Sequence, residues 1–419
     1  MSDSDATFGS DHTHHTHDSG DSGIEVLDPS FFGRAHHVYR AWREEGGVRR
    51  ARFPGPTPVE GWVITSYAEA KAALADPRLS KHRSVERFGR HVGLTSGPGS
   101  ALFTHMLNSD PPEHTRLRKL VQRAFTAKRT AGLRPLVEGH VTSLLDAWEG
   151  REEAELIGEF ALPLPVAVAF DLFGASDADH EALQVRGNTL TGGQGDGEVS
   201  VFTAESMLAY LRALLDLKRE HPDDGLLSAL LTARHEDEDA LSEDEITSMA
   251  FLLFVAGHQT TVNLIANGIH TLLMHPDQRA ALTADPTLMP RAVEEILRYE
   301  SPSALASFRY ATEPVTVAGV TIQEGEFVQI SLLGANRDPH LFPDPDRFDI
   351  HREEASRHVA FGHGIHHCLG APLARLQAEV AFTRILERFP GLRPAEGENA
   401  VWQSNPRHRG LLELPVRLR

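Results

Sequence analysis

The 419-residue sequence holds one cysteine, Cys368, and its surroundings suggest chemistry. It lies in the glycine-rich stretch FGHGIHHCLG, residues 361–370, directly before a segment, residues 371–389, whose pattern predicts a helix. A thiolate is a soft ligand for metal ions and for haem iron, and a helix N-terminus stabilises an anion. Three interpretations stay open: a buried structural cysteine, an axial ligand of haem, or a zinc site with the neighbouring histidines. Zinc is the weakest of the three, because no Cys-x-x-Cys pair completes a tetrahedral site.

A second group of polar residues interrupts a long apolar segment. Ser242 and Glu245 form a capping-box pattern, which predicts a helix that begins there and runs to about Met274. Its centre reads AGHQTT, residues 256–261. A glycine and polar side chains inside a buried helix cost free energy unless they serve a site. This stretch is therefore predicted to belong to a functional site.

Two charged pairs occur at helical spacing elsewhere in the chain. His114 and Arg118 are four residues apart in a segment that opens with acids and prolines, so they share one face of a predicted helix. Glu295 and Arg298 are three residues apart, which favours an ion pair on one helix face. Neither pair is specific alone, because such pairs are common on exposed helices.

These motifs occur together in the order seen in the cytochrome P450 superfamily, which the chain resembles over residues 25–419. The residues that fit its Phe-Gly-x-Gly-x-His-x-Cys-x-Gly loop are Phe361, Gly364, His366, Cys368 and Gly370. The resemblance implies a mainly α, triangular-prism fold with small β-sheets in a single domain, residues 25–419. Residues 1–24 are polar and His-rich, and are expected to form a disordered tail.

The resemblance also implies haem b as cofactor, O2 as co-substrate, and Cys368 as the metal ligand. The residues it assigns to haem binding are His114, Arg118, Arg309, Phe361, Gly362, His366 and Cys368. Those it assigns to the catalytic stretch of the central helix are Ala256, Gly257, Gln259 and Thr260. Gln259 departs from the family pattern, which has an acid there; Thr260 is expected to position water for proton delivery. Whether Gln259 takes part or only fills a polar position stays open.

Other parts of the chain are assigned by pattern and resemblance. Glu295, Arg298 and Arg347 are expected to form a buried triad that supports the cysteine loop. The loop at 80–109 is expected to lie over the haem, and the glycine-rich stretch 187–197 to form a lid. Helices are predicted at 35–45, at 67–75 and over 131–220 with breaks at Pro163 and Pro165; β-structure is predicted at 61–67, 315–320, 327–332 and 411–418.

Composition restricts the class of protein. The net charge is −18, with 59 acidic residues against 41 lysines and arginines, which argues against a nucleic-acid partner. The N-terminus has no apolar signal-peptide core, and the apolar run 249–257 is far shorter than the roughly 20 residues that span a bilayer. One cysteine excludes an internal disulfide. We therefore expect a cytoplasmic, soluble monomer without membrane attachment.

The function that the resemblance implies is a monooxygenase that inserts one oxygen atom from O2 into a small organic substrate. The similarity is to bacterial members that hydroxylate or epoxidise macrolides, polyketides or other secondary metabolites. No flavin or nicotinamide motif occurs in the sequence, so a ferredoxin and a ferredoxin reductase are the expected electron donors, docking on basic residues such as Arg116, Lys119 and Arg375. Two alternatives remain: a haem-thiolate oxidase or peroxygenase, for example one that couples phenols, and a non-catalytic haem sensor.

Overall fold

The computed structural model describes residues 24–53, 58–82, 98–125, 127–175, 197–233, 240–395 and 400–419. The predicted tail, residues 1–24, lies outside the described residues except for Ile24. The predicted lid, 187–197, lies outside them except for Gly197, and residues 83–97 of the 80–109 loop are also outside.

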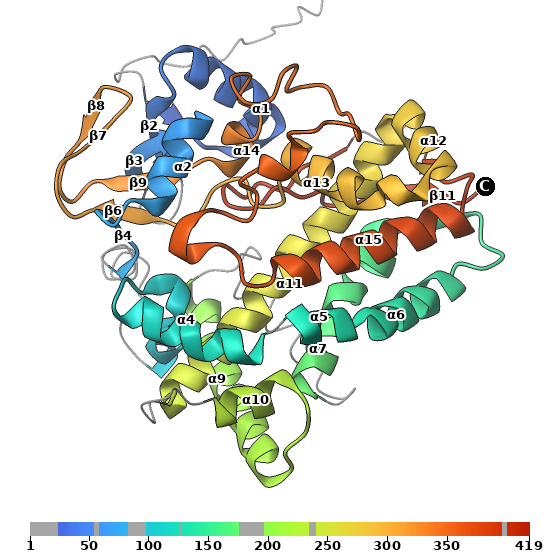
Figure 1. Cartoon of the computed structure of the whole chain (residues 1–419), viewed down its shortest axis with the longest axis horizontal. Helices are drawn as coiled ribbons and strands as arrows, with labels where there is room; N and C mark the ends of the chain where they lie inside the picture. The colour runs from blue at the N-terminus through green and yellow to red at the C-terminus, as the bar shows by residue number, and fades with distance from the viewer. Residues whose placement is uncertain are drawn as a thin grey trace, which may run out of the picture.

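The described chain is mainly α-helical with small sheets, as the sequence predicts; the largest sheet and a hairpin lie at the left of Figure 1, and β11 of another sheet lies at the right, beside the C-terminus. The helices are α1 Pro29–Glu44, α2 Tyr67–Ala75, α4 Glu113–Ala124, α5 Ala127–Gly132, α6 Arg134–Asp146, α7 Pro163–Phe173, α9 Gly197–Glu220, α10 Leu226–Thr232, α11 Glu243–Met274, α12 Pro276–Ala284, α13 Met289–Tyr299, α14 Leu332–Ala335 and α15 Ala371–Arg388. Short 3-10 turns include η1 Pro98–Phe103, η2 Met106–Asn108 and η6 Gly364–His366.

The largest sheet has six short strands in the order β1-β2-β3-β9-β6-β4. Their bounds are β1 Glu25–Val26, β2 Val48–Phe53, β3 Val59–Ile64, β4 Leu79–Ser80, β6 Arg309–Ala311 and β9 Phe327–Ile330. β3 and β9 are parallel, with Trp62 opposite Val328, and β6 runs antiparallel to β9. Strands β5 Glu153–Glu155, β10 Arg393–Pro394 and β11 Pro415–Arg417 form a second sheet, and β7 Val315–Val317 with β8 Val320–Ile322 a hairpin. The predicted β-segments are thus confirmed, with shorter strands.

Two helices begin at residues other than those predicted from the sequence. α1 begins at Pro29, six residues before the predicted start, because the Asp28 carboxylate caps it by accepting the N–H of Ser30 at 2.8 Å. Pro163 and Pro165 begin α7 and do not interrupt a longer helix, which suits prolines in a first turn. The α2 prediction is confirmed without change.

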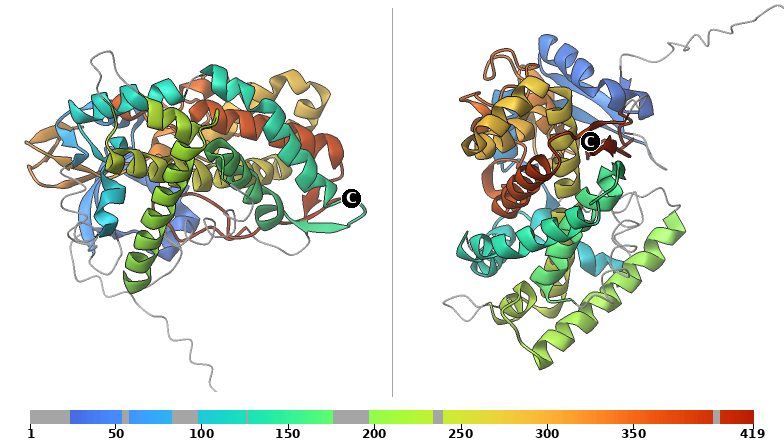
Figure 2. Two further views of the ribbon diagram at one scale, coloured as in Figure 1. Left: turned by 90° about the horizontal axis from the view of Figure 1, so that it is seen from below. Right: turned by 90° about the vertical axis from the view of Figure 1, so that its right-hand side faces the viewer.

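The central element is α11, 32 residues long, which crosses the molecule behind α15 in Figure 1 and contacts α7, α9, α13 and α15. The predicted capping box is present: the Ser242 hydroxyl accepts the N–H of Glu245 at 3.3 Å, and the Glu245 carboxylate accepts the N–H of Ser242 at 2.7 Å. By length and composition α11 could cross a membrane, but 67% of its most apolar window is buried inside the protein. It is a core helix, and the views of Figure 2 show it enclosed by its neighbours.

The crossing of α11 and α15 is close because of one glycine. A Cβ placed on Gly268 would lie 2.2 Å from Cζ of Phe382, a residue that is itself fully buried. A contact that short would force the two helices apart. Gly268 therefore sets how near the helix that follows Cys368 lies to the helix that carries Thr260.

The expected triad is partly wrong. Glu295 and Arg298 are fully buried and joined by two hydrogen bonds of 2.7 Å, as predicted. The side chain of Arg347, however, is 66% exposed and pairs with Asp349 at 3.4 Å. Arg352 takes its place: its side chain is 7% exposed and its Nε donates to Glu295 at 3.3 Å.

The backbone explains this replacement. Arg347 turns its carbonyl inward, where it accepts from Arg298 at 3.2 Å and from Arg352 at 3.0 Å. Arg352 also donates to the carbonyl of Asp344 at 3.0 Å, a residue with φ of 46°. Arg352 therefore closes the 343–352 loop around the buried carboxylate, whereas Arg347 contributes only its main chain.

Candidate active site

The cysteine loop, residues 359–370, connects the 355–357 turn to α15 through tight backbone turns. The Cys368 N–H donates to the Phe361 carbonyl at 2.9 Å, and Gly362 has φ of 72°. Gly364 has φ of 73° and packs against α2, where an added Cβ would lie 3.2 Å from Cα of Ala75. A side chain at Gly364 would therefore be strained as well as crowded. The loop is held against α2 in this way.

The thiol of Cys368 keeps exposed surface although protein surrounds it closely. Desolvation raises its pKa above the ordinary value. The N–H groups of Gly370 and Ala371, at the start of α15, donate to the sulfur and oppose this rise, as do the positive charges of Arg118 and Arg375. These N–H groups and positive charges thus stabilise a thiolate at Cys368. A metal cation bound to the sulfur would stabilise the thiolate further.

Beside the loop, the predicted cationic residues come together. His114 on α4 is buried, with its ring centroid 4.4 Å from that of His366. The Arg118 guanidinium donates to the His367 carbonyl at 2.7 Å. Burial, with the charge of Lys81 next in importance, lowers the pKa of His366 to about 2, so this ring is neutral at pH 7.

Arg309 reaches the same region from β6. It is 4% exposed and donates to the carbonyls of Leu74 at 3.0 Å and Leu79 at 3.4 Å. Burial lowers its pKa to about 10, while the charges of Asp110 and Asp76 act in the opposite direction. It therefore remains a cation at neutral pH.

Several polar atoms here are buried without a hydrogen-bond partner: Nδ1 and Nε2 of His114 and Nε of Arg309. An unpaired buried polar group costs about 1–3 kcal/mol, so such atoms indicate that they serve a ligand. Cationic and N–H donors grouped near one exposed cysteine suit a cofactor that offers a soft metal ion at its centre and carboxylates at its edge. Haem b with its two propionates fits these residues.

The predicted catalytic stretch of α11 has an open surface in the middle of a mostly buried helix. Ala256 and Gly257 are exposed, and outside its own stretch of α11 no heavy atom lies within 4 Å of a Cβ built on Gly257. The Thr260 hydroxyl donates to the Ala256 carbonyl at 2.9 Å. Its oxygen lone pairs stay available to accept from water. This combination of a gap and a hydroxyl suits a small ligand and a proton route.

Gln259 and His258 flank this stretch of α11. The Gln259 amide donates to Oδ1 of Asn263 at 3.3 Å, one turn further along α11. His258 is buried, its ring 6.1 Å from that of Phe254, and desolvation lowers its pKa to about 4. At neutral pH His258 is therefore uncharged, and neither of its ring nitrogens has a hydrogen-bond partner among the described residues.

Sequence reasoning missed three supporting groups. Asp110 precedes α4 and accepts the backbone N–H groups of Lys81 at 2.9 Å and His82 at 3.2 Å. Glu294 binds Arg375 at 2.6 Å, and the Arg375 guanidinium lies 4.6 Å from the ring centre of Phe361 in the cysteine loop. Arg352 is the third group. Their partners lie far away in the chain, so no local pattern could have found them.

The basic docking face expected for a redox partner is weaker than predicted. Arg116 binds Glu113 and Glu245, and Arg375 binds Glu294. Lys119 is exposed. Two of the three predicted cations thus already have acidic partners.

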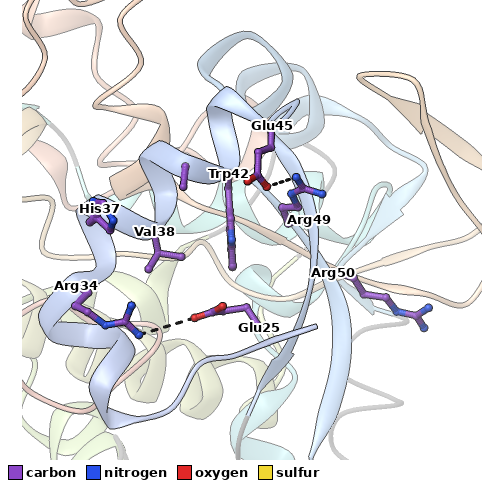
Figure 3. A pocket seen from close by; sticks show the side chains of 9 residues that line it. Glu25, Arg34, His37, Val38, Trp42, Glu45, Arg49 and Arg50 are labelled. Carbon is purple, nitrogen blue, oxygen red and sulfur yellow. Dashed lines mark hydrogen bonds and ion pairs between the residues drawn. The ribbon is translucent and has the colours of Figure 1, made fainter. Parts of the chain in front are cut away.

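A surface hollow far from the cysteine loop in the chain lies between α1 and the first strands (Figure 3). Its charged side chains pair within it, Arg34 with Glu25 at 4.0 Å and Arg49 with Glu45. It holds none of the predicted site residues.

Comparison with known proteins shows which family the sequence and the fold resemble. The family described as Cytochrome P450 matches residues 203–400. The chain is 48% identical to cytochrome P450 107B1 of Saccharopolyspora erythraea, with 94% of this chain and 97% of that protein covered. It is 45% identical to the cytochrome P450 monooxygenase PikC of Streptomyces venezuelae, with 94% of each covered. The structure of the tirandamycin C-bound P450 monooxygenase TamI superposes with a TM-score of 0.86 at 43% identity, covering 94% of this chain and 100% of that one.

Proposed function

The chain belongs to the cytochrome P450 family of haem-dependent monooxygenases, and from this premise we propose which of its residues hold the haem, move the proton and meet the substrate. One observation carries the proposal: Cys368, an exposed cysteine just before α15, lies close to Arg118 and to His366, whose ring contacts His114, and His114 and Arg309 keep buried nitrogens without a partner among the described residues. A merely structural cysteine would be packed on all sides.

We assign the axial ligand to Cys368. The electron-rich thiolate favours O–O bond cleavage when haem is bound, and this is the chemistry that the cofactor supplies. The side chains proposed to receive the propionates are His114, Arg118, Arg309 and His366. Phe361 and Gly362 fix the backbone of the cysteine loop: the Phe361 carbonyl accepts the Cys368 N–H, and Gly362 makes a tight turn with positive φ.

The protein's own contribution to catalysis is proton delivery from α11. Ala256 and Gly257 leave room beside the helix, and Thr260 orients water there through its lone pairs while its hydrogen is held by Ala256. Gln259 is neutral and already bound to Asn263, so it supports the helix and does not exchange protons. This favours the interpretation in which Gln259 fills a polar position.

The proposed reaction is hydroxylation or epoxidation of a macrolide, a polyketide or another secondary metabolite. Support comes from the similarity to TamI, whose structure was solved with tirandamycin C. Electrons would come from a ferredoxin and its reductase, with the protein acting as a cytoplasmic monomer. The net charge of −18 fits a protein that stays in solution and does not bind nucleic acid.

The decisive experiment is spectroscopic. The reduced, CO-bound protein should show the red-shifted Soret band of thiolate ligation, and Cys368→Ser should lose it while keeping its helical circular dichroism. Retention of that band in the variant would refute the assignment. Turnover of a bound substrate with ferredoxin, reductase and NADPH but not with hydrogen peroxide would separate a monooxygenase from a peroxygenase. A sensor would show neither.

A further inference from the structure

The segment 402–411, near the C-terminus, is hydrogen-bonded to Ala304 on one side and to α11 on the other. The Arg407 carbonyl accepts the N–H of Ala304 at 3.0 Å, just upstream of Arg309. Two residues later, the Arg409 carbonyl accepts from Asn267 of α11 at 2.9 Å. Gly410 lies against Asn263, since a Cβ there would be 2.2 Å from Oδ1 of that residue. The backbone at Arg407 is therefore fixed close to the helix that carries Thr260.

The Arg407 side chain combines two properties that rarely occur together. It has exposed surface, yet enough protein surrounds it to lower its pKa by desolvation. Cys368 shows the same combination. Each of these side chains can therefore reach a ligand from a position that is largely surrounded by protein.

Charge effects connect Arg407 with the site. Its positive charge helps to lower the pKa of Lys81, of His105 and of the adjacent His408. His408 is also affected by His258 of α11, and Lys81 by Arg309. The Arg407 charge is therefore close enough to act on Lys81, which is itself affected by the predicted haem-binding residue Arg309, and the Arg407 backbone is held between Ala304 and α11.

The neighbouring cations already have partners. The Lys81 ammonium donates to the Ser307 hydroxyl and to the Phe308 carbonyl at 3.2 Å. Arg409 binds Glu300 at 3.1 Å and the Phe32 carbonyl at 2.7 Å. Within the residues that the structure describes, the Arg407 guanidinium has no carboxylate within ion-pair distance and makes no side-chain hydrogen bond.

We propose that Arg407 binds an anionic group of the substrate, a carboxylate, and so orients the molecule beside Thr260. The proposal rests on the proposed function and extends it to a substrate class: amphiphilic acids in preference to their neutral counterparts. A guanidinium can grip both oxygens of a carboxylate, which fixes orientation as well as position. Desolvation of Arg407 strengthens such a contact, because an unpaired buried charge is costly.

The test uses probes that ligate the haem iron at one end. A series of ω-(imidazol-1-yl)alkanoic acids of increasing chain length is titrated into the haem-loaded protein, each beside its methyl ester, and the Soret shift gives the Kd. The imidazole binds iron in both members, so the acid/ester ratio isolates the carboxylate. We expect about ten- to a hundredfold tighter binding of the acid at one chain length. Arg407→Gln should abolish this preference, and Arg407→Lys should keep part of it.

The matched control is Arg384→Gln, a solvent-exposed arginine on α15 that should leave the ratio unchanged. Equal binding of acid and ester at every length would overturn the proposal, as would a preference that persists in Arg407→Gln. Faster haem loss from Arg407→Gln than from the control would also overturn it, because the guanidinium would then serve the cofactor. Failure of the proposed function looks different: wild-type protein would show no Soret shift with any imidazole.

Discussion

The rings of His114 and His366 lie 4.4 Å apart at their centroids, an edge-to-face contact between residues 252 positions apart in the chain. This contact joins α4 to the cysteine loop. Both rings are expected to be neutral at pH 7, because desolvation lowers the pKa of each. The pair can thus meet without charge repulsion and still present N–H groups to a carboxylate.

His114 and His366 are expected to bind haem as a pair. His114→Phe and His366→Phe keep the ring shape but remove the N–H donors, so each should release haem faster, by roughly tenfold if one charge-assisted hydrogen bond of about 1.5 kcal/mol is lost. The measurement is transfer of haem to apomyoglobin.

A matched control is His363→Phe, in the same loop but outside the expected donor set. Haem loss that is equally fast in all three variants would contradict the pairing and point to general loosening of the loop.

Arg352, and not Arg347, should carry the stability of the 343–352 loop. Arg352→Ala removes one of the ion-pair partners of the buried Glu295 carboxylate. Breaking a buried ion pair lowers the free energy of unfolding by about 3–5 kcal/mol. Arg347→Ala keeps the inward carbonyl and removes only an exposed side chain, so the change should stay within about 0.5 kcal/mol. Urea unfolding followed by circular dichroism compares the two variants directly. Equal destabilisation would restore Arg347 to the triad.

Thr260 should control how efficiently electrons are used. General acid–base assistance is typically worth ~10²–10⁴-fold, so Thr260→Ala should lower product formed per NADPH consumed and raise hydrogen peroxide release. Thr260→Ser keeps the hydroxyl and is expected to retain most of the coupling. Unchanged coupling in Thr260→Ala would exclude this hydroxyl from the proton route.

Gln259→Glu tests the role of the neutral amide separately. The variant restores the acid of the family pattern but loses the donor to Asn263. If Gln259 only fills a polar position, haem content and the solvent isotope effect on turnover should match those of the wild type. A changed isotope effect would show that this position takes part in proton transfer.

Glu294 is expected to make the free energy of unfolding depend on pH in the acid range. Burial alone would raise its pKa, but His358 and Arg375 lower it to about 2 from an ordinary value of 4.5. A carboxyl group whose pKa is lower in the folded than in the unfolded protein stabilises the folded state at pH values above the unfolded pKa. For Glu294 this stabilisation is lost as the pH falls from about 4.5 to about 2. The shift corresponds to about 3 kcal/mol at most.

Glu294→Gln should therefore be less stable than the wild type at pH 7 and should lose less stability between pH 5 and pH 3. The measurement is urea unfolding at each pH. Parallel pH profiles for the two proteins would show that Glu294 does not carry the dependence.

What the sequence determined by itself was local. The capping box of Ser242 and Glu245 fixes the start of α11, and the contiguous loop around Cys368 holds its thiol and glycines within ten residues. The Asp28-Pro29 cap that begins α1 is an equally local signal. In each case the interacting groups are near neighbours in the chain, so spacing alone predicts the geometry.

Tertiary structure decided which of several similar side chains points inward. Arg347 and Arg352 lie in the same loop, and only the fold turns one of them toward Glu295. Arg407 and Arg409 are two residues apart, yet Arg409 meets Glu300 while Arg407 keeps exposed surface and has no ion-pair partner among the described residues. Guanidinium groups are chemically alike, and their surroundings come from segments about 50 to 100 or more residues away. Packing between distant elements, which no local pattern encodes, makes that choice.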